Sequence, residues 1–399
     1  MNIPLLDLKR QYYGIQKEIM ESVREVFESQ SFILGKRGQD LEKKVADCCE
    51  VPWALGVASG TDALLISLRA LGVGPGDAVL TTPFTFFATA GAIHNLGAIP
   101  IFLDIDPLTF NLCPERITEF LEGRSLAPGH AGQPASLLKS GRVRALLPVH
   151  LYGQMAAMGE ILQIGERYGL KVLEDAAQSI GSSQTGGVGL LQSRPAGSLG
   201  DAGAISFFPS KNLGGAGDGG MIVTRREDLA ESVRMLRVHG SRVKYIHDQV
   251  GWNSRLDEIQ AAVLLVKLSH LPRWNQARRD NAALYLRLLE EWDLTEYCRP
   301  PAVASGNYHI YNQFVVRVRR RDELRQFLSD HGVGSDIYYP IPLHLQKCFS
   351  HLGYAAGDCP VSEEASREVL ALPVFPELTP EEIRTVVGWI REFYQGQSG

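Results

Sequence analysis

The sequence predicts an α/β fold with a mostly parallel, seven-stranded sheet covered by helices, followed by a smaller α+β C-terminal domain. Seven short apolar runs alternate with helical stretches over the first part of the 399 residues. These runs are continuously apolar, as in strands that are buried on both faces. From about Asn253 the pattern changes to longer helices and fewer strands. We therefore expect two domains, residues 1–252 and 253–399.

Each element of the first domain follows from its pattern. An amphipathic helix over 7–29 and a helix over 39–49 precede the sheet. The expected strands are 53–57, 78–81, 100–103, 145–149, 171–173, 202–208 and 221–224. The expected helices between them are 62–71, 88–96, 115–121 and 158–168. In such a sheet the carboxyl ends of the strands form the ligand crevice.

The second domain has a different order of elements. We expect helices over 256–268 and 274–292 with a break at Pro272, then strand 313–318, helix 322–331, strand 335–339 and helix 380–394. Two Gly- and Ser-rich stretches, 123–141 and 182–200, show no periodicity and are predicted to be surface loops. The base of the second loop is expected to border the active site.

Composition excludes several classes of protein. A net charge of −5 supplies no basic surplus for a nucleic-acid partner. The six cysteines form no CxxC pair and the histidines no metal-binding cluster, so we expect a reduced, cytoplasmic protein without a metal. The first residues reach a charge too early for a signal peptide, and no apolar run has membrane-spanning length.

One lysine follows an apolar strand end and precedes a glycine-rich loop. Lys211 is followed by five glycines within ten residues, which indicates backbone that approaches a ligand or turns tightly. A plain surface lysine is the alternative. A lysine in this context can form a Schiff base with the aldehyde of pyridoxal phosphate, since partial burial lowers its pKa. The same amine can then move a proton at the substrate.

An acid ends the neighbouring strand at Asp175. A carboxylate there can keep the pyridine nitrogen of the cofactor protonated, and Gln178 can bond its phenolic oxygen. The alternative is that Asp175 is a helix N-cap. The presence of Lys211 downstream favours the cofactor interpretation.

Small and polar residues follow the first strand and open a helix. Gly60 and Thr61, at this expected helix N-terminus, can bind a phosphate, and Ser206 can add a hydroxyl. The alternative is N-capping by Thr61 or Asp62 alone. The sequence has no dinucleotide or P-loop fingerprint at this place.

Aromatic residues follow the second strand. Phe86 is the candidate for stacking on the cofactor ring, whereas Phe84 and Phe87 are expected to be core residues.

Several motifs, in order, resemble those of the DegT/DnrJ-type nucleotide-sugar aminotransferases, which are pyridoxal phosphate enzymes of fold type I. The resemblance runs nearly end to end. The motifs are Ser59-Gly60-Thr61-Asp62-Ala63-Leu64, Val149-His150-Leu151-Tyr152-Gly153-Gln154, Glu174-Asp175-Ala176-Ala177-Gln178 and Ser206-Phe207-Phe208-Pro209-Ser210-Lys211.

The resemblance implies a role for each matching position. Lys211 would carry the cofactor and Asp175 would be its ring-nitrogen partner. The remaining cofactor residues would be Gly60, Thr61, Phe86, Gln178 and Ser206. Asn253 would reach the phosphate of a second subunit, so that a homodimer shares its active sites. Arg255, Tyr338 and Tyr339 would lie near the substrate.

The same resemblance narrows the reaction. Relatives that dehydrate deoxysugars carry histidine where this chain has Lys211, so transamination is favoured. The segments 211–220 and 239–245 resemble members that act on 3-keto sugars, and Tyr338 disfavours a uronate. The expected reaction moves an amino group from L-glutamate to C3 of a dTDP- or UDP-linked keto sugar.

Three alternatives stay open. The chain could be a C4 aminotransferase, catalyse another pyridoxal phosphate reaction such as desulfuration or aldol cleavage, or be a non-catalytic regulator that binds the cofactor.

Overall fold

The computed structural model describes residues 2–124, 141–185 and 192–395, and its centre is a seven-stranded sheet of order β1-β9-β8-β5-β4-β2-β3. Strand β9 is antiparallel to both of its neighbours, and the other pairs are parallel. The mostly parallel sheet predicted from the sequence is therefore confirmed. The strands are β1 (Trp53–Val57), β2 (Ala78–Thr81), β3 (Ile99–Phe102), β4 (Val143–Leu146), β5 (Lys171–Asp175), β8 (Ala202–Ser206) and β9 (Gly220–Thr224).

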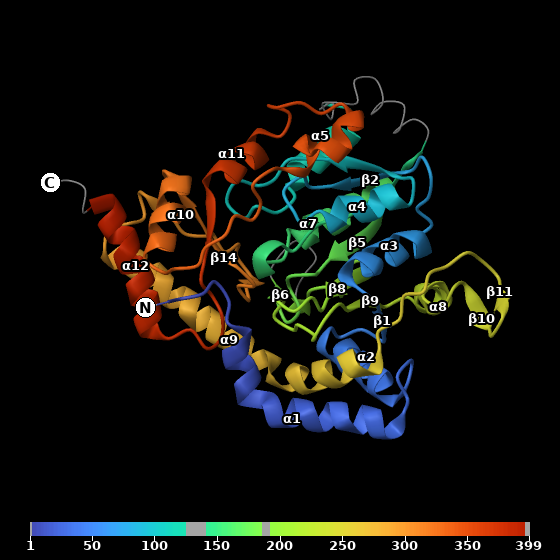
Figure 1. Ribbon diagram of the computed structural model, residues 1–399. Coiled ribbons are helices and arrows are strands. Elements are labelled where there is room, and N and C mark those ends of the chain that lie inside the picture. Colours follow the sequence, from blue (N-terminus) through green and yellow to red (C-terminus); the bar gives the residue numbers. More distant parts are fainter. Residues whose placement is uncertain (1, 125–140, 186–191, 396–399) are drawn as a thin grey trace.

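Helices cover both faces of this sheet (Figure 1). Successive strand residues point to opposite faces: Met221 and Val223 pack on one side and Ile222 on the other. One face packs against α2 (Lys36–Cys48), α5 (Pro114–Leu121), α7 (Met158–Tyr168) and the start of α9. The other face packs against α3 (Gly60–Ala70), α4 (Ala88–Asn95) and α8 (Glu227–Leu236). Burial on both faces explains why the strands lack alternation.

The helix α9 (Glu258–Glu291) is continuous, so the predicted break at Pro272 is wrong. Proline inside a helix costs about 3 kcal/mol because it lacks an N–H group and its ring clashes with the preceding turn. Packing of α9 on α1 (Leu8–Ser29), α2 and α12 (Pro380–Gln395) outweighs this cost. Its first half contributes to the core beside the sheet and its second half to the C-terminal core.

The C-terminal part is α+β, as expected, but one strand was misplaced. Its three-stranded sheet contains β12 (Cys298–Arg299), β14 (Phe314–Val318) and β15 (Val369–Leu372). The predicted strand over 335–339 is wrong: Asp336 makes only an isolated bridge to Ala371, and the sheet position is taken by β15. The helices here are α10 (Arg321–Asp330) and α11 (Pro360–Glu368), with short turns η2 (Leu343–Leu345) and η3 (Lys347–Leu352).

The N-terminal strand segment crosses to this C-terminal core. Ile3 is fully buried in it and pairs with Val333. In Figure 1 the N-terminus accordingly lies beside α12. A division of the chain at residue 252 stays a prediction.

Several shorter elements complete the fold. The predicted loop 123–141 lies largely outside the described residues, and 186–191 of the second loop do too. The base of the second loop is not irregular, since β6 (Ser183–Gln184) pairs with β7 (Arg194–Pro195) on one side and with β13 (Asn307–Tyr308) on the other. A hairpin, β10 (Ser241–Val243) and β11 (Ile246–His247), projects from the sheet domain (Figure 1). Across the described ranges, every helix is too short or too polar to cross a membrane.

Two helices begin two or more residues earlier than the sequence predicted. Helix α2 starts at Lys36 rather than residue 39, because the buried carboxylate of Glu258 accepts the N–H groups of Gly35, Arg37 and Gly38. This carboxylate satisfies N–H groups that a helix start leaves without partners. Helix α3 starts at Gly60 rather than residue 62, with consequences for the site described next.

Candidate active site

A cavity of about 630 Å³ lies where β5 and β8 end and reaches the segment 337–339 of the C-terminal part. Its position at the carboxyl ends of neighbouring strands is the one expected for this class of sheet. Most of the residues predicted from the sequence line it: Gly60, Thr61, Phe86, Asp175, Gln178, Ser206, Lys211, Tyr338 and Tyr339. The structure therefore brings the two key residues, Lys211 and Asp175, into one pocket.

Lys211 lies in the turn that follows β8. Its N–H donates to the carbonyl of Phe208 at 2.9 Å, which fixes the backbone from which the side chain enters the cavity. Burial lowers the pKa of the Lys211 amine to about 8, and the nearby Asp175 carboxylate opposes this change. A larger fraction of this amine is therefore neutral near physiological pH than for an exposed lysine, and the neutral form is the nucleophile.

Asp175 is the last residue of β5 and is 5% exposed. Its Oδ2 accepts the Thr89 hydroxyl at 2.8 Å, and its Oδ1 accepts the N–H of Ala177 at 3.2 Å. Burial raises the pKa of Asp175, while these two hydrogen bonds and the charge of Lys211 lower it. The residues after Asp175 form a turn rather than a helix, so the N-cap alternative is wrong.

A second buried carboxylate, that of Glu174, stabilises the end of β5. Glu174 accepts N–H groups of Gly197, Leu199 and Gly200 and contacts the ring Nε2 of His150 at 2.8 Å. These bonds tie the end of the 182–200 segment to the strand that carries Asp175. None of the described residues of 182–200 lines the cavity, so the segment is linked to the site only through β5, the strand that carries Asp175.

The start of α3 forms the opposite end of the cavity. Ser59 is the N-cap, because its hydroxyl accepts the N–H of Asp62 at 3.0 Å; capping by Thr61 or Asp62 is therefore wrong. A Cβ atom at Gly60 would lie 2.6 Å from the Cβ of Ser206, so only glycine lets the helix start approach β8 this closely. Thr61 is exposed to the cavity. Free N–H groups and hydroxyls at a helix start suit a phosphate.

Aromatic side chains form one wall. Phe86 is 59% exposed, and its ring lies 6.4 Å from that of Tyr339. Phe84 is buried, as expected, but Phe87 is not a core residue: it is partly exposed and stacks on Phe349. Gln178 is held by two bonds, one from the Tyr152 N–H to its Oε1 and one from its Nε2 to the Tyr339 hydroxyl.

Two predicted residues lie outside the described wall of the cavity, Asn253 and Arg255. Asn253 is exposed, and it bridges to Val238 at the base of the β10–β11 hairpin. Arg255 is partly buried, and its Nε has no hydrogen-bond partner among the described residues. The chain by itself gives neither residue a contact with the cavity.

Sequence reasoning missed several residues that line the cavity, among them Thr89 and Gln313. Thr89, in the first turn of α4, lies four residues after Thr85, and this pair of hydroxyls soon after strand β2 was a signal that could have found it. Gln313 directly precedes β14 and has a buried Oε1 without a partner in the described structure. No local motif distinguishes Gln313, because only the packing of the C-terminal part brings it to this cavity.

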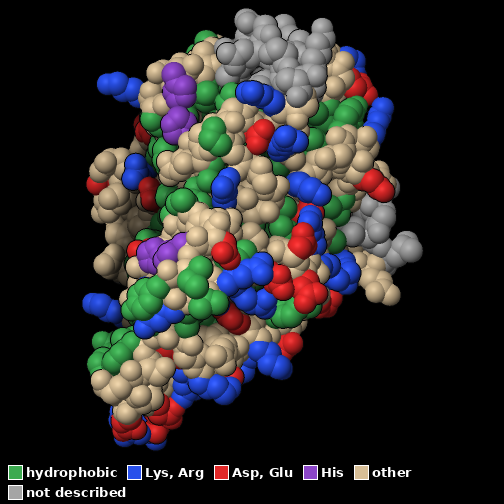
Figure 2. All heavy atoms as spheres, turned by 90° about the vertical axis from the view of Figure 1, so that its right-hand side faces the viewer, with side chains coloured by type: hydrophobic (Ala, Val, Ile, Leu, Met, Phe, Trp, Pro, Cys, Tyr) green, Lys and Arg blue, Asp and Glu red, His purple; other side chains and the backbone are tan. Residues whose placement is uncertain are grey.

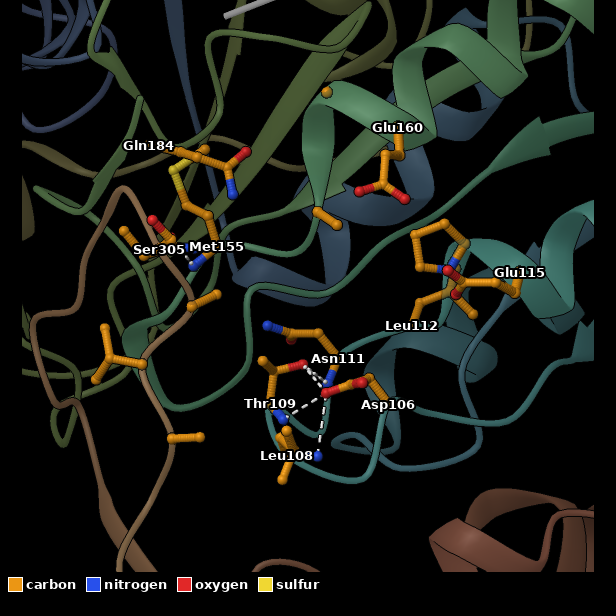
Figure 3. Close-up of a pocket in the computed structure, with 17 residues that line it drawn as sticks. Asp106, Leu108, Thr109, Asn111, Leu112, Glu115, Met155, Glu160, Gln184 and Ser305 are labelled. Carbon is orange, nitrogen blue, oxygen red and sulfur yellow. Dashed lines mark hydrogen bonds between the residues drawn. The ribbon is translucent and has the colours of Figure 1, made fainter. Parts of the chain in front are cut away.

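A separate cavity of about 420 Å³ lies between the loop 106–115, the start of α7 and the loop 302–307 (Figure 3). Figure 3 shows that Asp106 bonds the backbone of its own loop, through the N–H groups of Leu108 and Thr109. No residue predicted from the sequence as functional is among its described lining residues. Its carboxylates, among them Glu160, provide controls for variants of the main site.

In this cavity, a lysine that can be neutral near physiological pH and a buried carboxylate lie opposite the N-terminus of a helix. Together with a mostly parallel sheet, this arrangement is typical of pyridoxal phosphate enzymes with this fold. Residues 14–391 match the model of the DegT/DnrJ/EryC1/StrS aminotransferase family, and the chain belongs to this family. The predicted enzyme class, a pyridoxal phosphate-dependent aminotransferase, and its cofactor are thereby confirmed.

Individual relatives match over nearly their whole length. A "pleiotropic regulatory protein" of Geobacillus stearothermophilus is 47% identical, with 99% of both chains covered. A UDP-N-acetyl-3-dehydro-alpha-D-glucosamine 3-aminotransferase of Acidithiobacillus ferrooxidans is 42% identical, covering 99% of this chain and 98% of the relative. The crystal structure of DesV of S. venezuelae, solved in complex with a ketimine intermediate, has a TM-score of 0.89, 37% identity and 99% coverage of both chains.

Proposed function

We propose that this aminotransferase moves an amino group from L-glutamate to C3 of a nucleotide-linked keto sugar, with a dTDP- or UDP-sugar as the acceptor. The products are a nucleotide-linked 3-amino sugar and 2-oxoglutarate. The observation that carries the choice of C3 is the 42% identity, over nearly the whole chain, to a 3-aminotransferase of a UDP-linked sugar. The cavity that holds Lys211 and Asp175 supports the chemistry.

The residues of the cavity suit each task of this reaction. When bound, pyridoxal phosphate supplies an aldehyde that condenses with amines and a ring that withdraws electrons. Lys211 would bind the aldehyde carbon and would then move the proton at the substrate carbon. Asp175 would hold a proton on the ring nitrogen, and Gln178 would bind the ring hydroxyl. Gly60, Thr61 and Ser206 would hold the phosphate, and Phe86 would cover the ring face.

The substrate enters from the C-terminal side of the cavity in this proposal. Tyr338 and Tyr339 line that side, next to Gln313. The Nε of Arg255 has no hydrogen-bond partner among the described residues and suits a carboxylate or a sugar oxygen. These residues and a second subunit would enclose the sugar.

A homodimer with shared active sites accounts for the exposed apolar surface. The β10–β11 hairpin exposes Tyr245 by 83% and Ile246 by 60%, and hydrophobic side chains reach the surface on the face that Figure 2 shows. Apolar side chains grouped in this way mark a protein–protein contact. Asn253 follows this hairpin and is exposed, so it is free to reach the cavity of a partner.

We expect the wild-type protein to be a dimer, and the double substitution Tyr245→Asp and Ile246→Asp to shift it toward monomer. Turnover should fall with dimer content, because the partner completes each site. Light scattering during gel filtration and turnover at matched concentrations measure both effects. Leu108→Asp, which changes an exposed apolar residue beside the separate cavity, is the control. A double variant that is monomeric and fully active would refute the shared sites.

We also place the enzyme in the cytoplasm. All six cysteines are free, and Cys298 and Cys359 are buried as thiols. Free thiols are characteristic of reducing compartments.

The two half-reactions test the proposed function. The holoenzyme is treated with L-glutamate, freed of 2-oxoglutarate, and mixed with UDP-, dTDP- and GDP-linked 3-keto and 4-keto sugars. We expect glutamate to change the visible absorbance of the bound cofactor and a 3-keto sugar to restore it, with a 3-amino sugar as product. Restoration by 4-keto sugars alone would move the reaction to C4.

A regulatory role is the second candidate, because the 47% identical relative carries that description. A regulator without catalysis would bind the cofactor yet show no absorbance change with glutamate. Desulfuration or aldol cleavage would appear as a response to other amino acids without 2-oxoglutarate formation.

A further inference from the structure

Two threonine hydroxyls stand in line behind the buried Asp175. The Thr89 hydroxyl donates to Oδ2 of Asp175 at 2.8 Å, and the Thr85 Oγ1 lies 3.1 Å from the Thr89 Oγ1. All three residues are buried, with exposures of 3% for Thr85, 1% for Thr89 and 5% for Asp175. An ionised carboxylate only accepts hydrogen bonds, so the single Thr89 proton points to Asp175. The Thr85 hydroxyl must then donate to Thr89, and the chain runs in one direction.

This direction depends on the charge of Asp175. A carboxylate favours both donors in their present orientation, whereas a protonated Asp175 would itself need an acceptor. Hydrogen bonds to an ionised group are stronger than those between neutral groups, and low polarity around them strengthens the chain. The position of the Thr89 hydroxyl is also fixed, because the backbone of Thr89 belongs to the first turn of α4, in the wall of the cavity.

We infer that Thr89, supported by Thr85, is a positioning residue that keeps Asp175 ionised and directed at the ring nitrogen of the cofactor. The inference rests on the proposed role of Asp175. Within the described residues, the only other hydrogen bond to the carboxylate comes from the N–H of Ala177 to Oδ1 at 3.2 Å, so Oδ2 depends on Thr89. Without this hydroxyl, a buried carboxylate oxygen would lack a donor.

Other charged and titratable groups face the carboxylate from the surrounding elements. Lys211, from the turn after β8, and His150, from the segment after β4, favour the ionised form. Tyr339, on the opposite wall, has its own pKa raised in part by Asp175. These groups are the same in wild type and in a Thr89 variant, so a comparison between the two isolates the hydroxyl.

The substitution Thr89→Val removes the donor and keeps the shape, and Thr89→Ser keeps the donor. We expect kcat of Thr89→Val to fall about ten- to a hundredfold at neutral pH, as for loss of one hydrogen bond to a charged group, with a smaller change in KM for glutamate. The acid limb of its rate profile should move to higher pH, because Asp175 protonates more easily. Thr89→Ser should restore both the rate and the profile.

The cofactor-free protein gives a second readout. Burial already raises the pKa of Asp175 above its ordinary value, so ionisation of Asp175 costs stability as pH rises through its folded pKa. Loss of the Thr89 donor raises this pKa further. The melting temperature of Thr89→Val should therefore lie furthest below that of wild type at neutral pH. The difference should be smaller in acid, where Asp175 is protonated in both proteins.

Coincident pH profiles for wild type and Thr89→Val, or a melting difference independent of pH, would overturn the inference. If Thr89→Val does not fold, Thr85→Val provides the test, since it removes only the outer hydroxyl and should shift the same limb less. An unchanged Thr85→Val profile would then count against the chain. If Asp175→Asn is fully active, the proposed role of Asp175 is wrong. If Asp175→Asn is inactive but Thr89→Val behaves like wild type, only the inference about Thr89 is wrong.

Discussion

Replacing Lys211 by methionine is expected to abolish amino-group transfer, with turnover reduced by about 10⁴-fold or more. Methionine fills a similar volume but has no amine to bind the aldehyde or to move the proton. The visible absorbance that depends on the bond between Lys211 and the cofactor should disappear as well. Turnover with glutamate and a keto sugar, together with absorbance spectra, measures both losses.

When both proteins are free of cofactor, Lys211→Met should be more stable against unfolding than wild type. Burial lowers the pKa of Lys211 to about 8 from 10.5, so the folded protein binds this proton less tightly than the unfolded chain. Stability is therefore gained as pH rises from about 8 to 10.5 and is lost as pH falls through the folded pKa. Below that range the buried charged amine costs on the order of 2 kcal/mol, allowing for its partial exposure to the cavity.

Melting curves of the cofactor-free proteins between pH 7 and pH 10.5 check this sign. Lys267 also has a pKa lowered to about 8 by burial, but it is present in both proteins and cancels in the difference. Glu160→Gln, in the separate cavity, serves as a control that should change neither turnover nor the stability profile. A Lys211→Met protein that keeps turnover would remove the basis of the assignment.

The sheet and the core of the site were predictable because their signals are local. Continuous apolar runs predict strands buried on both faces, and residues at their carboxyl ends converge by the geometry of a parallel sheet. Lys211 follows β8 and Asp175 ends the neighbouring strand β5, and both were found in this way. Gly60 and Thr61 at the start of α3 were found for the same reason.

The wrong predictions concern positions whose structure is determined by packing against residues far away in the sequence. Pro272 stays inside α9 because three other helices pack along it, and a local propensity cannot show this. Glu258 extends α2 by three residues although it lies far along the chain. Gln313 reaches the cavity, and Asp336 fails to form a strand, because of how the C-terminal sheet is assembled. Phe87 was misjudged for a related reason: it stacks on the buried Phe349 of the C-terminal part and is itself 46% exposed.

Replacing Asp175 by asparagine should reduce turnover about a thousandfold while leaving the fold intact. The backbone of Asp175 is fixed on both sides, by its N–H bond to Pro148 and by the bond from the His150 N–H to its carbonyl. The asparagine carbonyl can still accept the N–H of Ala177, so the local turn is kept. What is lost is the charge that holds a proton on the ring nitrogen, and removal of such an electrostatic group costs about 10²–10³ in kcat.

A second effect distinguishes this loss of charge from mere misfolding. The Asp175 carboxylate raises the pKa of Lys211, in opposition to burial. Without the charge, the Lys211 amine should titrate below its wild-type value of about 8, so its reaction with an amine-modifying reagent should begin at lower pH in the cofactor-free variant. Asp175→Asn should thus have a more reactive lysine and a far slower enzyme, a combination that unfolding cannot produce. Equal lysine titration in the two proteins would mean that the charges do not interact across the cavity.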